Sequence, residues 1–131
     1  MISSPRPEPQ PPELRVLLIE DSAILRRRLT EMLSEPGRIS VMAWAATETD
    51  ARAAIEAAEY DVLLVDVELR EGTGIGAIRH ARAHYPADRQ PLIIVLTNYP
   101  WAPVRQRCLA MGANHCLDKM RQFEEVKGLI A

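Results

Sequence analysis

The sequence predicts an α/β fold in which five short parallel strands alternate with five helices. Five mostly aliphatic runs have the length of strands, and three of them are unbroken, as in sheets covered on both faces. These runs span residues 15–19, 41–45, 62–65, 92–96 and 115–117. Because strand–helix–strand units cross over right-handed and helices must cover both faces, the alternation predicts a doubly wound parallel sheet with a crevice where the winding reverses.

Each helix is predicted from apolar residues that recur at helical spacing between the strands. Four segments carry a clear stripe: Leu25, Leu29, Met32 and Leu33; Ala51, Ala54, Ile55 and Ala58; Val104, Cys108 and Met111; and Phe123, Val126 and Ile130. Residues 74–85 form a further helix with a weaker pattern. Pro36 with Gly37 should end the first helix, Thr47 with Asp50 resembles a capping box for the second, and Gly112 follows the fourth.

One domain accounts for the length of 131 residues. Five prolines crowd the first thirteen residues, and we expect residues 1–13 to be a disordered or extended tail. The remaining residues, 14–131, then form the domain. A composition of 47% hydrophobic and 26% charged residues is typical of a globular protein.

Charge and hydropathy argue against several functional classes. A formal net charge of -2 gives no electrostatic reason to expect nucleic acid or an anionic membrane as partner. No aliphatic run approaches the roughly 20 residues of a membrane span, and the start lacks the apolar core of a signal peptide, so we expect a cytoplasmic protein. Cys108 and Cys116 lack a metal-binding pattern, and we expect reduced thiols there rather than a structural metal site or a disulfide.

Polar residues stand where four of the predicted strands end. Glu20 and Asp21 follow the first strand, Asp66 the third, Thr97 the fourth and Lys119 the fifth. The carboxyl ends of parallel strands meet at one edge of a sheet, so three carboxylates should converge there and repel one another. Hard oxygen donors without His or Cys favour Mg²⁺, which the sequence therefore predicts as the cofactor.

This set of side chains is suited to phosphoryl transfer. Asp66 is the candidate nucleophile, because a carboxylate is already ionised at neutral pH and needs no general base to attack phosphorus. Lys119 supplies a compact positive charge and Thr97 a hydroxyl donor for the phosphoryl oxygens. Catalysis of phosphoryl transfer consists mostly of such placement and charge neutralisation.

With these residues in place, the chain from about Leu14 onward resembles a response-regulator receiver domain of two-component signalling. The resemblance is carried by four segments: VLLIEDS with Glu20 and Asp21, LLVDVELREGTGIG with Asp66, IIVLTN with Thr97, and GANHCLDK with Lys119. It implies a flavodoxin-like sheet with strand order 2-1-3-4-5, and a protein that is not an enzyme except toward its own phosphoryl group.

The resemblance also implies roles for individual residues. Asp66 would accept a phosphoryl group from a kinase phosphohistidine. Asp21, Asp66 and the main-chain carbonyl of Glu68 would hold Mg²⁺, with Glu20 acting mainly through water. Glu68 and Tyr99 stand where receivers tune the lifetime of the phosphoryl group.

Two departures from the family pattern concern the readout. Receivers couple phosphorylation to the residue at Thr97 and to an aromatic residue three positions before the lysine, where this chain has Cys116. Met120 stands where many receivers have Pro. We therefore expect an ordinary phosphorylation site with an unusual switch.

The expected partners are proteins. A histidine kinase or phosphotransfer protein would supply the phosphoryl group to a stand-alone receiver, and a downstream protein would read its state. The fourth and fifth helices with the last strand are the expected surface for that target or for a homodimer.

Two alternatives stay open. One is an adaptor of the same fold that is never phosphorylated, which the missing aromatic and Pro would favour. The other is a small phosphatase of the haloacid dehalogenase type, which needs a second acid two residues after its nucleophile; Glu68 is a poor substitute for the usual Asp.

Three further features are expected to have ordinary roles. The glycines at 72, 74 and 76 miss the spacing of a phosphate-binding loop and predict a flexible turn. The basic run 26–28 predicts a solvated helix face, with kinase docking as the alternative. The histidines lie outside the acidic group and are expected at the surface: His80, His84 and His115.

Overall fold

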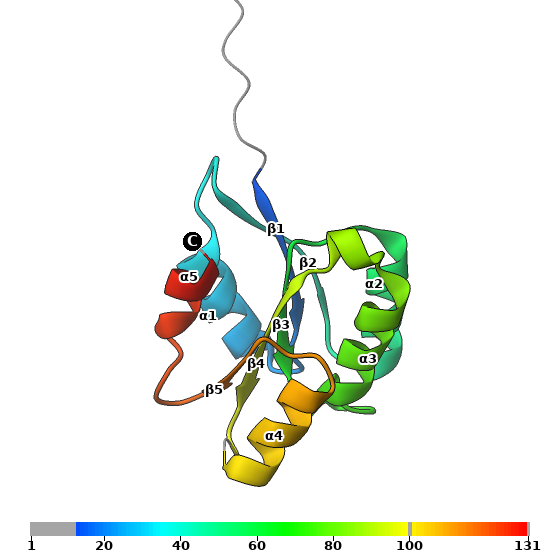
Figure 1. The fold of residues 1–131 in the computed structure, drawn as a ribbon. Helices are drawn as coiled ribbons and strands as arrows, with labels where there is room; N and C mark the ends of the chain where they lie inside the picture. Colours follow the sequence, from blue (N-terminus) through cyan, green and yellow to red (C-terminus); the bar gives the residue numbers. More distant parts are fainter. Residues whose placement is uncertain (1–12, 100, 131) are drawn as a thin grey trace, which may run out of the picture.

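The computed structural model describes residues 13–99 and 101–130, which form five strands and five α-helices in alternation (Figure 1). Apart from Glu13, the expected tail lies outside the described residues. The strands are β1 (Leu14–Ile19), β2 (Ile39–Ala45), β3 (Val62–Asp66), β4 (Leu92–Thr97) and β5 (His115–Asp118). The helices are α1 (Ala23–Leu33), α2 (Glu48–Ala57), α3 (Gly74–His84), α4 (Ala102–Ala110) and α5 (Glu125–Ile130), with a short 3-10 turn at Ala87–Arg89.

All five strands pair in parallel, in the order β2-β1-β3-β4-β5. This confirms the predicted fold class and strand order. Two layers of helices enclose the sheet: α1 and α5 pack on one face, and α2, α3 and α4 on the other (Figure 1). None of the helices in the described ranges is long and apolar enough to cross a membrane.

Strand alternation divides the core between the two faces. In β1, Leu17 and Ile19 pack toward α2 and α3, whereas Val16 and Leu18 pack toward α1 and α5. All five residues of β3 are buried, as expected for the central strand of a sheet covered on both sides. Because β3 is buried and paired with a strand on each side, Asp66, its last residue, has a fixed position at the edge of the sheet.

Strand β2 departs from simple alternation. The register against β1 shifts between Val16 and Leu17, so that Met42 is an extra residue between Val41 and Ala43. Val41 consequently packs on the α1 side and Ala43 on the α2 side, although they are two residues apart. This bulge also leaves Met42 exposed to solvent.

Side-chain caps begin three of the helices. The hydroxyls of Ser22, Thr47 and Thr73 accept hydrogen bonds from N–H groups in the first turns of α1, α2 and α3. The expected cap at Thr47 is confirmed, with the Asp50 N–H as its donor at 3.1 Å. Helix α1 ends at Leu33, three residues before Pro36, because the chain then enters a turn joined to β2 by the Glu35–Ile39 bridge.

Arg82 anchors the carboxyl end of α4. Its guanidinium extends from α3 and donates to the main-chain oxygen of Gly112 through two nitrogens, at 2.8 and 2.6 Å. Further bonds reach the main-chain oxygen of Pro91 and the side chain of Asn114. The start of α4, by contrast, has no side-chain cap.

Candidate functional site

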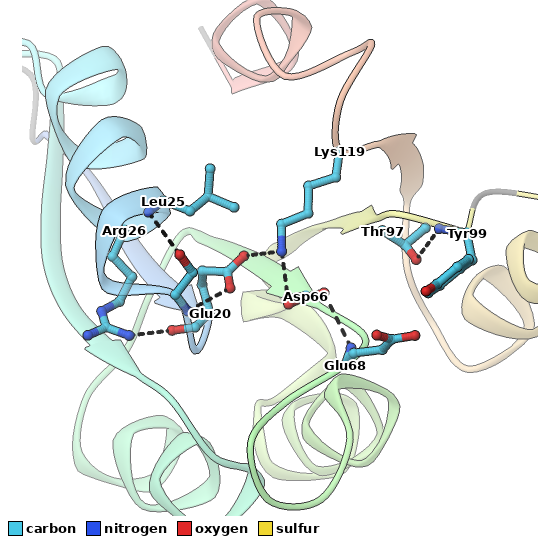
Figure 2. A network of polar contacts seen from close by, with 9 residues as sticks. Glu20, Leu25, Arg26, Asp66, Glu68, Thr97, Tyr99 and Lys119 are labelled. Carbon is cyan, nitrogen blue, oxygen red and sulfur yellow. Dashed lines mark hydrogen bonds and ion pairs between the residues drawn. The ribbon is translucent and has the colours of Figure 1, made fainter.

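The carboxyl ends of β1, β3, β4 and β5 lie at one edge of the sheet, and Figure 2 shows the side chains gathered there. Glu20 follows β1, Asp66 ends β3, Thr97 ends β4 and Lys119 follows β5. Asp21 belongs to the same group, since carboxylate oxygens of Glu20, Asp21 and Asp66 lie within 4.8 Å of one another. The three carboxylates thus meet at this edge of the sheet, where strand ends also bring Thr97 and Lys119.

Lys119 binds two of the carboxylates at once. Its Nζ lies 2.7 Å from Oε1 of Glu20 and 3.0 Å from Oδ2 of Asp66. The side chains of Glu20 and Asp66 are buried, with exposed fractions of 3% and 7%, and that of Lys119 is 11% exposed. One positive charge therefore faces two buried acids, with the exposed Asp21 beside them.

Burial shapes the proton affinities of this group. Desolvation raises the pKa of Glu20 to about 7, although Lys119 opposes the change. Desolvation also raises the pKa of Asp66, again against the pull of Lys119. For Lys119 itself, burial alone would lower the pKa, but the two carboxylates outweigh it and the pKa rises. The ammonium is thus held charged between two acids whose ionised forms are disfavoured by burial.

The three acids suit a hard divalent cation. They offer only oxygen donors, and they come from two neighbouring strand ends. Burial raises the pKa of Glu20 and of Asp66, so a bound cation would stabilise their ionised forms. Asp21, which is exposed, gives such an ion a side open to solvent. The residues present therefore fit Mg²⁺ better than a softer metal.

Glu20 is held by the start of α1. Its Oε2 accepts the N–H of Ser22 at 3.0 Å, and its main-chain oxygen accepts Nη1 of Arg26 at 2.8 Å. The guanidinium of Arg26 also stacks on the exposed ring of Trp44, with the ring centroid 3.8 Å away. Arg26 is therefore not simply part of a solvated helix face, as expected for the basic run, because its side chain binds the main chain of Glu20.

Asp66 is positioned by the segment that follows it. Its Oδ1 accepts the N–H of Glu68 at 3.3 Å, and the N–H of Gly74 donates to the oxygen of Val67 at 2.9 Å. The start of α3 packs so closely against β3 that a Cβ on Gly74 would lie 2.1 Å from the main-chain oxygen of Asp66. The absence of a side chain at this position therefore allows the close approach.

Glu48 joins the start of α2 to the same segment. Its Oε1 accepts the N–H of Thr73 at 3.0 Å, and its side chain fills the space where Gly72 and Gly76 lack a Cβ. Arg52 pairs with the carboxylate at 3.0 Å. The glycine-rich turn is thus packed against α2, a role that the sequence did not indicate because Glu48 lies far away along the chain.

Thr97 and Tyr99 lie beside the acidic group. The buried hydroxyl of Thr97 accepts the N–H of Tyr99 at 3.1 Å, and Figure 2 places Tyr99 and Glu68 on the opposite side of Asp66 from Glu20. The exposed rings of Tyr99 and Trp101 pack together with centroids 4.9 Å apart. The two residues expected to flank a phosphoryl group therefore lie on one side of Asp66.

Cys116 occupies an interior position in β5. It is 1% exposed and lies in the core next to Cys108, and burial raises the pKa of both thiols. The small side chain of Cys116 is part of the core, and it stands where receivers typically have a large aromatic side chain. Both cysteines are free, as expected.

Comparison with known proteins agrees with this geometry. Residues 16–131 match the sequence profile of the response regulator receiver domain. A protein-glutamate methylesterase/protein-glutamine glutaminase from Rhodospirillum rubrum is 30% identical over 115 residues, which are 88% of this chain and 30% of that protein. The transcriptional activator DevR/DosR from Mycobacterium tuberculosis is 31% identical over 88% of this chain and 50% of its own length. The chain thus spans a half or less of these relatives.

Two solved structures share the fold at appreciable identity. The response regulator domain of Thermotoga maritima CheB is 25% identical with a TM-score of 0.74, and the match covers 90% of each chain. The receiver domain of the sensor histidine kinase PA1611 from Pseudomonas aeruginosa is 28% identical with a TM-score of 0.75, covers 91% of this chain and 95% of its own, and coordinates a magnesium ion in its active-site cleft. From the sequence match, the shared fold and the acidic edge of its sheet, this chain belongs to the response regulator receiver domain family.

Proposed function

We propose that this chain is a phosphoacceptor of two-component signal transduction and that Asp66 receives the phosphoryl group from the phosphohistidine of a kinase or phosphotransfer protein. The observation that carries the proposal is the position of Asp66. Asp66 is the last residue of the central strand, and its carboxylate lies 3.0 Å from the ammonium of Lys119. The carboxylates of Glu20 and Asp21 lie beside it. No histidine is needed, because the nucleophile is a carboxylate.

In the proposed reaction, a carboxylate oxygen of Asp66 attacks the phosphorus of the phosphohistidine. A P–O bond forms, the P–N bond breaks, and the imidazole nitrogen leaves with the bonding electron pair. Lys119 and Thr97 would donate to phosphoryl oxygens. Since the Thr97 hydroxyl oxygen already accepts the N–H of Tyr99, its own proton is available for such a bond.

Glu20, Asp21, Asp66 and the main-chain carbonyl of Glu68 are the proposed holders of Mg²⁺, with Glu20 acting mainly through water. When bound, the ion supplies positive charge that offsets the repulsion between the acids and the incoming phosphoryl group. Lys119 now serves as the counter-ion of both Glu20 and Asp66. Occupation by a divalent cation would relieve it of that role and free its ammonium for the phosphoryl oxygens.

Phosphorylation is proposed to act through protein contacts in the cytoplasm. It adds a group of about -1.5 to -2 charges at the sheet edge, next to the start of α4. Glu68 and Tyr99 would tune the lifetime of that group, and Thr97 would report it to α4, with Cys116 in place of the usual aromatic. The surface formed by α4, β5 and α5 is the proposed site for a target protein or a second copy of the chain.

A phosphorylation assay tests the proposal. The protein is incubated with Mg²⁺ and a small-molecule phosphodonor, and its intact mass is recorded. We expect one added phosphoryl group that is lost in Asp66→Asn and kept in Asp88→Asn, the control at an exposed aspartate in the 3-10 turn. Beryllofluoride should bind the wild type and the control and not Asp66→Asn.

Two results would contradict the proposal and point to its rivals. If wild type and Asp66→Asn both gain no mass and bind no beryllofluoride, the chain is an adaptor of the same fold. Sustained release of phosphate from phosphate esters, dependent on Asp66, would instead indicate a phosphatase. One retained equivalent of phosphoryl group would rule out both.

A further inference from the structure

Helices α2 and α3 pack side by side on one face of the sheet and run in the same direction (Figure 1). Each follows a strand and returns antiparallel to it, so both helices end near the edge where the strands begin. That edge is opposite to the one that holds Asp66. Helix carboxyl ends carry partial negative charge, and two such ends together favour a bound cation.

Three metal-ligating side chains meet near these helix ends. Glu56 comes from the last turn of α2, and His80 and His84 come from the last turns of α3. The histidines are four residues apart and therefore lie on the same helix face, where their rings stack with centroids 6.0 Å apart. One ligand atom from each of the three side chains lies within 4.8 Å of the other two.

His80 has an unused ligand atom. Its side chain is 23% exposed, but Nε2 is shielded from solvent and makes no hydrogen bond within the described part of the chain. Oε1 of Glu56 lies 3.1 Å from this nitrogen, outside the geometry of an N–H donor. Two ligands bound to one tetrahedral Zn²⁺ at about 2.0–2.2 Å are about 3.3–3.6 Å apart, slightly more than this distance. The observed separation thus suits two ligands of a single metal ion.

The backbone around the cluster is braced. The hydroxyl of Tyr85, the residue after α3, lies 3.1 Å from the main-chain oxygen of Ile55 and 2.9 Å from that of Ala58. These oxygens flank Glu56 on α2. The ring of His84 in turn packs edge-on against Tyr85, with centroids 5.3 Å apart. The two helices are therefore held in the register that brings Glu56 to the histidines.

We propose that Glu56, His80 and His84 form a second metal site, for a transition metal that accepts imidazole ligands, with Zn²⁺ as the probe. The set of two imidazoles and one carboxylate differs from the all-oxygen donors around Asp66, so the two sites select different ions. Water completes the coordination on the exposed side. The bound ion joins the ends of α2 and α3.

The experiment titrates Zn²⁺ into the full chain without an affinity tag, in excess Mg²⁺, and measures stoichiometry and Kd by calorimetry. We expect one Zn²⁺ per wild-type chain. The Kd should be at least about tenfold higher than that of wild type in His84→Gln, His80→Gln and Glu56→Gln. His84 and Glu56 are exposed, so these two variants keep the fold even if His80→Gln does not. His115→Gln is the matched control, and Asp66→Asn reports any contribution from the acidic edge.

A second readout assigns the ligands directly. The imidazole NMR signals of His80 and His84 should shift on addition of Zn²⁺, while those of His115 should not. The proposal is wrong if His84→Gln binds Zn²⁺ as tightly as wild type, or if His115→Gln or Asp66→Asn weakens binding as much as His84→Gln does. It is also wrong if Zn²⁺ binds only by bridging two chains, which sedimentation would reveal as a dimer.

Discussion

Gly74→Ala tests how closely the start of α3 must approach Asp66. The new Cβ would lie 2.1 Å from the main-chain oxygen of Asp66 and 2.7 Å from Cγ1 of Val65, whereas real Cβ contacts are essentially never shorter than 3.0 Å. The first turn of α3 must therefore move away from β3 by nearly 1 Å. Gly74 is buried and its neighbours are backbone and core atoms, so the strain has little room to relax.

We expect Gly74→Ala to lower the free energy of unfolding by about 1–3 kcal/mol, the usual cost of overpacking a core. It should also slow phosphorylation of Asp66, because Gly74 bonds to the oxygen of Val67, and the N–H of the next residue, Glu68, binds Oδ1 of Asp66. Urea unfolding followed by circular dichroism gives the first quantity, and the rate of mass gain with a phosphodonor gives the second.

Gly128→Ala is the control. Gly128 lies in α5, and within the described part of the chain a Cβ there would meet no atom within 4 Å outside the backbone of its own helix. Since Ala is the better helix former, this variant should be more stable by about 0.5–1 kcal/mol and phosphorylate normally. If Gly74→Ala is as stable as wild type and reacts at the same rate, the close packing of α3 on Asp66 is not required and the reasoning fails.

Three other predictions concern buried polar groups. The pKa of Glu20 is raised from 4.5 to about 7, so the folded chain binds more protons than the unfolded chain between these pH values. Without divalent ions, the free energy of unfolding should therefore fall as the pH rises from 4.5 to 8. In urea unfolding, Glu20→Gln should reduce this fall by about 3 kcal/mol. Arg82→Ala should cost about 2–3 kcal/mol, measured in the same way, because it leaves the oxygens of Gly112 and Pro91 without their charged donor; an unchanged midpoint would contradict this. Tyr85→Phe should cost about 1 kcal/mol and lower the melting temperature, since its hydroxyl joins α2 to α3, and equal melting temperatures would refute that link.

The sequence predicted the fold because its signals are local and repeated. Aliphatic runs and helical stripes recur in alternation, and the observed strand order agrees with the prediction. It could not predict the extra residue Met42 in β2, because a bulge depends on the register against β1. It did predict that α1 ends before Pro36 and Gly37, which lie in the turn after the helix.

The acidic edge was predictable for a similar reason: each of its residues lies at the end of a strand or within two residues after it. What escaped prediction depends on side chains that meet across elements. Lys119 bridges Glu20 and Asp66, and Glu48 fills the space beside the glycines; both contacts join distant parts of the chain. Arg26 binds the main-chain oxygen of Glu20 across the turn into α1. The histidine pair in α3 was visible in the sequence, but nothing there indicated that α2 would bring a carboxylate to it.

The one-sided anchoring of α4 has a mechanical consequence. Arg82 fixes the turn after this helix, while its first turn has no side-chain cap and Cys108 is its buried residue. A helix of nine residues is about 14 Å long, so a tilt of about 10° around the anchored end displaces the free end by about 2 Å. If α4 tilts, it therefore pivots at Gly112, and its first turn, next to Trp101, moves furthest. A displacement at the end of β4 would act at this free end, so it would tilt α4 around Gly112 and change the surface beside Trp101.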